Sequence, residues 1–216
     1  MNFQEPKRFE TTSYSAREQH DELRHVAIAL VALLWIGALC GFVFLARYEG
    51  TPGLAGYARE HWPSGSKLQP SSDVCTAVIF LHPECPCSVA SVEELAKINA
   101  HCRDKLKIIA VLSSPASNAD WRDSFIKKSP VRSSLDSIRG ITQIDDSGTE
   151  SRCFGVETSG DLVLYGPLGN LLFKGGITYA RGHTGDNPGG EDVIAAVNNN
   201  ESVTIKRAPV FGCSLK

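Results

Sequence analysis

Residues 77–88 read Ala-Val-Ile-Phe-Leu-His-Pro-Glu-Cys-Pro-Cys-Ser, an apolar run that ends in a turn holding two cysteines. The run is short and rich in β-branched and aromatic residues, which is typical of a buried strand. The residues after the turn predict an amphipathic helix, because their apolar positions recur every three to four residues. These positions are Val89, Val92, Leu95, Ile98 and Cys102. A thiol at the start of a helix meets free N–H groups and the positive dipole end, which stabilise a thiolate, so the pattern predicts a redox-active Cys85 with Cys87 beside it.

A second helix-start signal lies further along the chain. Ser91 and Glu94 have the spacing of a capping box, which starts the helix at Val92. Cys85 is then one turn away, where the effect of the helix dipole has faded. The sequence leaves both helix starts open.

Three neighbours of Cys85 are candidate supporting residues. Pro86 stiffens the turn, and the hydroxyl of Ser88 is able to hydrogen-bond the Cys85 sulfur. His82 lies three residues ahead and favours a thiolate when it is charged. The alternative for His82 is an ordinary histidine at the end of a strand.

Residues 26–45 form a run of twenty residues without a charge. About 20 apolar residues are needed to cross the bilayer as a helix, so we predict a membrane anchor through the lipid bilayer rather than a cleaved signal peptide. Four basic residues precede the run and two follow it closely, which keeps the N-terminus in the cytoplasm. They are Lys7, Arg8, Arg17 and Arg24, then Arg47 and Arg59. We therefore expect a single-pass protein of the cytoplasmic membrane with a periplasmic or extracellular C-terminal domain.

The remaining chain divides by composition. Residues 1–25 form the cytoplasmic segment, and residues 46–72 are rich in Gly, Pro and Ser, which predicts a linker. Residues 73–216 match the size of one domain. The net charge of −2 and the pI near 6.3 give no basic surface field, so nucleic acid is not an expected partner.

Six of the seven cysteines lie outside the predicted membrane helix, which contains Cys40. In an oxidising compartment such cysteines suggest disulfides, yet six cysteines allow fifteen complete pairings. We favour Cys75 with Cys102, because the start of the strand and the end of the following helix lie at the same pole. The alternative is that both are buried free thiols. The other four are Cys85, Cys87, Cys153 and Cys213.

The elements after the first strand and helix predict an α/β domain. We expect strands at 106–112, 141–144, 162–165 and 171–174, and helices at 118–128 and 191–197. The loop Gly166-Pro167-Leu168-Gly169-Asn170 joins two of these strands as a hairpin.

This order, with a cysteine turn between the first strand and helix, resembles the thioredoxin fold, a central mixed sheet flanked by helices, over about residues 73–200. Within that superfamily, the membrane span and the Cys-Pro-Cys turn are similar to membrane-tethered RedB-type proteins. The same similarity covers Gly175-Gly176-Ile177-Thr178, Arg181-Gly182-His183 and Phe211-Gly212-Cys213. The resemblance implies thiol–disulfide exchange with protein disulfides or thiols outside the membrane.

Two positions differ from the thioredoxin pattern. Ser88 stands where thioredoxins have their second cysteine, and Ser159-Gly160-Asp161 stands where they have a cis-proline. We expect Gly160 to permit a close backbone approach to Cys85.

The second thiol of the reaction has two candidates. Cys87 is nearest, although a disulfide across one intervening residue is strained. Cys213 is the other, because a terminal tail is able to fold back over the turn; the alternative for Cys213 is a structural bridge to Cys153. The polar loop 179–190 places Arg181 and His183 at the edge of the redox site or, alternatively, is a solvated connection.

Two other function classes compete with the oxidoreductase. Cys85 and Cys87 with His183 or Cys213 form a soft ligand set that suits Cu(I), as in copper binding or delivery. The third class is a non-catalytic interaction module whose cysteines form structural bridges. The thiol–disulfide oxidoreductase is the favoured interpretation and needs no cofactor; Cu(I) is the alternative.

Overall fold

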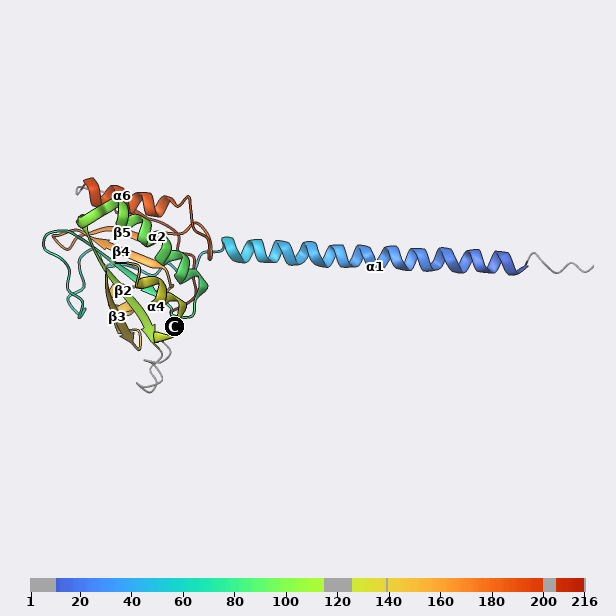
Figure 1. Ribbon diagram of the computed structural model, residues 1–216, viewed down its shortest axis with the longest axis horizontal. Helices are drawn as coiled ribbons and strands as arrows, with labels where there is room; N and C mark the ends of the chain where they lie inside the picture. Colours follow the sequence, from blue (N-terminus) through green and yellow to red (C-terminus); the bar gives the residue numbers. More distant parts are fainter. Residues whose placement is uncertain (1–10, 115–125, 139, 200–204, 216) are drawn as a thin grey trace, which may run out of the picture. The chain divides into compact units, whose positions relative to one another are not determined.

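The computed structural model describes residues 11–114, 126–138, 140–199 and 205–215 (Figure 1). It divides into two compact units, Met1–Tyr48 and Glu49–Lys216. Helix α1 (Thr11–Gly50) contains the predicted membrane helix. Its segment His20–Gly50 is long and apolar enough to cross a membrane, with a mean hydropathy of 2.7 over its most apolar stretch.

The second unit is built on a six-stranded mixed sheet with the strand order β3-β2-β1-β4-β5-β6. The first three strands in sheet order are parallel, β4 is antiparallel to β1, β5 is antiparallel to β4, and β6 is parallel to β5. The strands are β1 (Cys75–Leu81), β2 (Leu106–Ser114), β3 (Ile141–Asp146), β4 (Asp161–Tyr165), β5 (Leu171–Gly176) and β6 (Lys206–Arg207).

Helices cover one face of this sheet. Helix α2 (Pro86–Cys102) lies beside α6 (Pro188–Asn199) and α4 (Pro130–Leu135), as Figure 1 shows. Alternate residues of β1, among them Ile79 and Leu81, face these helices because successive side chains of a strand point to opposite faces. A short 3-10 helix, η1 (Arg103–Lys105), connects α2 to β2.

The other sheet face is covered by the chain after α1 and by α5 (Thr149–Phe154). Ala58 is fully buried there, and the ring of Trp62 lies 5.1 Å from Phe154 and 5.2 Å from Tyr165. The backbone N–H of Trp62 donates to Gly169 O at 2.8 Å. The compact unit begins at Glu49, so this segment packs as part of the domain where the sequence predicts a linker over 46–72.

The predicted element order agrees closely with the structure. All five predicted strands are present, and the last helix is longer at both ends than the predicted 191–197. Most of the predicted helix at 118–128 lies outside the described residues. The sequence did not predict α4 and α5, because each has six residues, too few to show a helical repeat.

Candidate active site

Cys85 is the N-cap of α2. The helix begins at Pro86, whose ring fixes the backbone angle that a first helical residue needs. The Cys85 sulfur therefore lies at the positive end of this helix, which favours a thiolate. The capping-box prediction is therefore wrong. Ser91 instead lies inside the helix, where its hydroxyl donates to Cys87 O at 3.1 Å.

The C-terminal tail brings Cys213 onto Cys85. The two Sγ atoms are 2.8 Å apart, and Cys85 is only 3% exposed to solvent. A disulfide bond is about 2.05 Å long, so a movement of less than about 1 Å joins the two sulfurs. Val210 and Phe211 are buried and anchor the tail on the domain.

The three clustered thiols share one negative charge, which rests on Cys85. A hydrogen bond from the Cys87 side chain is the main cause that lowers the pKa of Cys85, to about 4. Burial acts in the opposite direction, whereas hydrogen bonds from the Cys213 side chain and from the backbone N–H groups of Cys213 and Cys87 lower the pKa further. The hydrogen bond to Cys85, burial and the negative charge of Cys85 raise the pKa of Cys87 far above its usual value. Burial, followed by the contact with Cys85, raises the pKa of Cys213 to about 11. At neutral pH the cluster is therefore one thiolate and two thiols.

The turn before Cys85 is held by hydroxyl groups. Ser88 Oγ donates to His82 O at 3.0 Å and lies 2.7 Å from Ser159 Oγ, so its hydroxyl binds the end of β1 rather than the Cys85 sulfur. Ser159 Oγ also accepts from the His82 backbone N–H at 2.8 Å. The His82 ring accepts from the Glu84 N–H within the turn. Sequence reasoning missed Ser159, since a single serine beside a glycine is indistinguishable from loop punctuation.

Gly160 permits a close approach, but toward α2. Its φ of +89° lies in the left-handed region, and its N–H donates to Phe80 O at 2.7 Å. A Cβ at this position would lie 2.8 Å from Ser91 Oγ. The sequence predicts that Gly160 approaches Cys85, but the nearest atoms to such a Cβ belong to Ser91 and Phe211.

The tail continues past Cys213 as an extended segment paired with residues 157–159. Cys213 O accepts from the Ser159 N–H at 2.8 Å, and the Leu215 N–H donates to Glu157 O at 3.0 Å. Thr158 and Ser214 form an antiparallel bridge between these bonds. A Cβ on Gly212 would lie 1.9 Å from Ser159 O, so the close approach of tail and loop requires a glycine.

Arg181 and His183 lie in different surroundings. The Arg181 guanidinium donates to Gly212 O, and its charge lowers the pKa of both Cys87 and Cys213. The His183 side chain is 43% exposed and lies 3.5 Å from the Glu49 carboxylate, beside the Tyr179 ring. Within the part of the chain that the structure describes, no group of three or more His, Cys, Asp or Glu residues is arranged to hold a metal ion.

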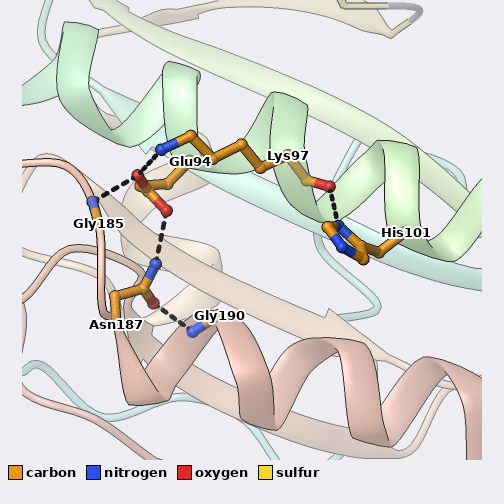
Figure 2. A network of polar contacts seen from close by, with 6 residues as sticks. All are labelled: Glu94, Lys97, His101, Gly185, Asn187 and Gly190. Atoms are coloured by element: carbon orange, nitrogen blue, oxygen red, sulfur yellow. Dashed lines mark hydrogen bonds and ion pairs between the residues drawn. The ribbon is translucent and has the colours of Figure 1, made fainter.

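Glu94 ties the loop that carries Arg181 to the middle of α2 (Figure 2). One carboxylate oxygen accepts from the Gly185 N–H at 2.8 Å and from Lys97 Nζ at 2.6 Å. The other accepts from the Asn187 side chain at 2.8 Å. Asn187 in turn accepts from the Gly190 N–H at the start of α6.

Three further cysteines of this unit lie outside the cluster formed by Cys85, Cys87 and Cys213: Cys75, Cys102 and Cys153. Cys75 and Cys102 are almost fully buried at the opposite end of the β1–α2 unit. Burial raises the pKa of Cys102, and the charge of Cys75 adds to this effect. Both cysteines are free thiols in the structure, so the predicted Cys75–Cys102 disulfide is not formed there. A Cβ on Gly65 would lie 3.7 Å from Cys153 Sγ. The neighbour of Cys213 is thus Cys85 rather than Cys153.

A buried ion pair lies next to the loop that binds the tail. Asp161 is fully buried, and its carboxylate lies 3.2 Å from Lys174 Nζ, which also donates to Ala55 O. Burial raises the pKa of Asp161 to about 7, against the opposing charge of Lys174. The only sequence signal for this pair is one acidic residue directly before the apolar run 162–165.

No protein-family model and no curated protein matches this chain. A crystal structure of a hypothetical protein from Sinorhizobium meliloti 1021 matches with a TM-score of 0.55 at 19% identity, over 78% of this chain and 97% of that one. An uncharacterized conserved protein from Geobacillus kaustophilus matches with a TM-score of 0.54 at 16% identity, over 78% and 91%. The pneumococcal exposed lipoprotein thioredoxin of Streptococcus pneumoniae TIGR4 matches with a TM-score of 0.42 at 17% identity, over 59% and 86%.

The order of the elements identifies the fold. A parallel β1–α2–β2 unit bearing the cysteine turn is followed by the antiparallel strands β4 and β5 and then by α6. This is the order on which the predicted fold class rests, and that prediction is confirmed. The domain that carries Cys85 has a thioredoxin-like fold, a mixed sheet flanked by helices.

Proposed function

We propose that this protein is a membrane-anchored thiol–disulfide oxidoreductase whose nucleophile is Cys85. The observation that carries the proposal is the contact of Cys85, the N-cap of α2, with a second cysteine sulfur 2.8 Å away. Disulfide exchange requires a nucleophilic sulfur and a nearby thiol, and this pair supplies both. The core packed beneath α2 holds the helix that presents Cys85, and the buried side chains of Val210 and Phe211 hold the tail that presents Cys213.

The reaction proceeds in two balanced steps. The Cys85 thiolate attacks one sulfur of a client disulfide; a bond forms between the two sulfurs, the client disulfide breaks, and the other client sulfur leaves as a thiolate that takes up a proton. Cys213 then loses its proton and attacks the Cys85 sulfur, which forms the Cys85–Cys213 disulfide and releases the first client sulfur as a thiol. The client gains two electrons and the Cys85–Cys213 pair loses two.

Cys213 is better suited than Cys87 to resolve the mixed disulfide. A Cys85–Cys87 disulfide closes a small ring across Pro86, which strains its geometry. Cys87 instead acts as a hydrogen-bond donor that holds the Cys85 thiolate. Burial and the contact with Cys85 raise the pKa of Cys213, and the charge of Arg181 acts against this rise, which favours loss of the Cys213 proton during the attack.

The proposed site of action is outside the cytoplasmic membrane. An apolar helix suited to span the bilayer precedes the domain, and the basic residues before residue 26 outnumber those that follow the span closely. A membrane-impermeant thiol reagent applied to intact cells is expected to label the reduced domain. Labelling that occurs only after lysis would place the domain inside.

Single serine substitutions test the residue roles. Cys213→Ser is expected to accumulate mixed disulfides with client proteins, because the first step proceeds and the second cannot. Cys85→Ser is expected to trap none. Cys87→Ser is the matched control: it keeps the resolving thiol, so it should release clients. Trapping by Cys87→Ser but not by Cys213→Ser would exchange the two roles, and trapping by Cys85→Ser would refute Cys85 as the nucleophile.

A further inference from the structure

The buried ion pair of Asp161 and Lys174 takes no part in the proposed reaction. Asp161 is fully buried at the start of β4, and Lys174 of β5 is only 4% exposed. Asp161 lies two residues before Val163, so its side chain points to the sheet face opposite α2. Burying two charges costs free energy that an apolar pair does not, so the geometry that this pair fixes explains it better than added stability does.

Lys174 holds the chain that crosses this sheet face after the membrane helix. Its Nζ donates to Ala55 O as well as pairing with the Asp161 carboxylate. Ala55 lies within residues 53–58, which we call the strap. The strap lies directly against the domain, since a Cβ on Gly155 would lie 1.8 Å from Tyr57 O. The amine thus joins the strap to β5.

The strap in turn holds the tail that presents Cys213. The Gly53 N–H donates to Val210 O at 2.8 Å, three residues before Cys213. Thr158, which pairs with the tail through its backbone, donates from Oγ1 to Leu54 O at 2.9 Å. Both hydrogen bonds connect the strap to the chain around the tail cysteine.

The tail also runs directly against β5. The Ala208 N–H donates to Lys174 O at 3.1 Å, and a Cβ on Gly176 would lie 2.6 Å from Pro209 O. Lys174 therefore contacts the tail through its backbone and the strap through its side chain. Loss of the amine frees the strap at Ala55 and weakens the support of the Val210 carbonyl.

We infer that Lys174 is a positioning residue for the resolving step: through the strap it keeps Cys213 against Cys85, although it belongs to neither the turn nor the tail. The inference rests on the proposed function, in which Cys213 closes the disulfide. A strap that moves away lowers the effective concentration of the Cys213 thiol at Cys85. The strap begins three residues after α1 ends, so the placement of the resolving thiol depends on the first part of the domain that follows the membrane helix.

Equilibrium with glutathione measures this effective concentration. The full chain in detergent micelles is equilibrated with reduced and oxidised glutathione, and its thiols are then trapped. Formation of one Cys85–Cys213 disulfide converts one oxidised glutathione into two reduced molecules, so the equilibrium constant has units of concentration. Peptide mapping gives the fraction of chains that carry this disulfide. Lys174→Met should lower the constant by at least about tenfold, because its tail is held less closely.

A second variant disturbs the strap and leaves the ion pair in place. A Cβ on Gly53 would lie 2.6 Å from Thr158 Oγ1, so Gly53→Ala displaces the strap from its hydrogen bonds. The constant should fall by at least about fivefold, as for the loss of one hydrogen bond. Since Lys174→Met and Gly53→Ala act through the same segment, the double variant should fall much less than the product of the two single losses.

Two control variants match these changes outside the strap. Lys107→Met removes an amine that donates to Gln69 O at 2.8 Å. Gly50→Ala adds a Cβ that has no atom of the described residues within 4 Å. Both variants should keep the constant within about twofold of the native value, because surface changes away from special contacts have small effects.

Near-UV circular dichroism restricts the comparison to folded protein. A role in stability alone would lower the unfolding midpoint and leave the constant of folded chains unchanged. If Lys174→Met does not fold, Lys174→Gln with Asp161→Asn serves instead. This pair of changes leaves no buried carboxylate without its cation, and the shorter glutamine withdraws the donor from Ala55 O.

Unchanged constants in Lys174→Met and Gly53→Ala, fully additive losses in the double variant, or an equal loss in Lys107→Met would overturn the inference and leave the proposed function intact. Failure of the proposed function has a different signature. If the native chain forms no Cys85–Cys213 disulfide at any ratio of the two glutathione forms, Cys213 is not the resolving thiol, and the inference fails with it.

Discussion

The two ends of the β1–α2 unit carry buried cysteines with opposite acidity. At the start of α2, Cys85 is 3% exposed and its pKa falls to about 4, whereas at the other end Cys102 is 1% exposed and burial raises its pKa. Nearly equal burial thus accompanies opposite shifts. The opposite pKa shifts come from hydrogen-bond donors. Cys85 accepts hydrogen bonds from two thiols and from backbone N–H groups, whereas Cys102 lies in an apolar cluster. Hydrogen bonding at the helix start outweighs the cost of burying the thiolate.

The largest expected effect is on disulfide exchange itself. Cys85→Ser removes the thiolate and should lower the rate of reduction of a peptide disulfide by at least about 10³-fold, because serine cannot form a disulfide. Cys102→Ser should leave the rate within about twofold, since it changes the far end of the helix. The measurement is turnover of the peptide disulfide with dithiothreitol as the donor. A comparable loss in both variants would show that the two ends do not differ in function.

The pH dependence of alkylation sharpens the comparison. The rate of Cys85 with iodoacetamide should rise through about pH 4 and then remain level, because its pKa is lowered to about 4. In reduced protein, Cys75 and Cys102 should react only at a higher pH than an ordinary thiol, since burial raises the pKa of both. Mass spectrometry of single peptides after timed labelling gives each profile. A midpoint for Cys85 near the usual thiol value would contradict the assigned thiolate.

Sequence reasoning succeeded where a pattern is local and failed where contacts are distant. The spacing of Val92, Leu95 and Ile98 was enough to predict the helix that follows the cysteine turn. The two conflicting helix starts were not separable by sequence, because Glu94 has the right spacing for a cap yet binds Gly185 and Asn187, some ninety residues away.

The site shows the same limit. The turn was predicted from adjacent residues, but the hydroxyl pair of Ser88 and Ser159 and the strand-like pairing of the tail depend on long-range placement. The segment 46–72 has the composition of a linker because its backbone runs irregularly across the sheet, which suits Gly and Pro as well as a free linker does.

The next largest effect concerns the far end. Cys75 and Cys102 are buried in one cluster and enclose about 27 residues, so in an oxidising compartment we expect these two free thiols to be joined. A disulfide that closes a loop of that length adds about 3.5 kcal/mol to the free energy of unfolding. Reduction should therefore destabilise the native chain by that amount, and it should destabilise the Cys102→Ala variant, which lacks this disulfide, much less. Peptide mapping without reductant identifies the bridge directly. Recovery of both residues as free thiols from protein that was never reduced would refute it.

The smallest effect lies between the two ends, at Glu94. Burial acts to raise its pKa, but hydrogen bonds from Lys97, Gly185 and Asn187 outweigh it and hold the pKa below the usual value. Glu94→Gln removes the charge and presents an amide N–H to another donor, which should cost about 1–2 kcal/mol of unfolding free energy at pH 7. Urea unfolding followed by near-UV circular dichroism measures this difference.

The pH dependence separates the charge of Glu94 from simple packing. Because the folded pKa is lowered, the stabilisation is complete above the unfolded value of about 4.3 and disappears as the pH falls through the lower folded value. The gap between native protein and Glu94→Gln should therefore narrow below about pH 4. Glu93→Gln is the matched control, because Glu93 is exposed on the same turn and should change stability by less than about 0.5 kcal/mol at either pH. A gap that stays constant with pH would mean that Glu94 anchors the loop by shape alone, and that its charge does not link the loop carrying Arg181 to α2.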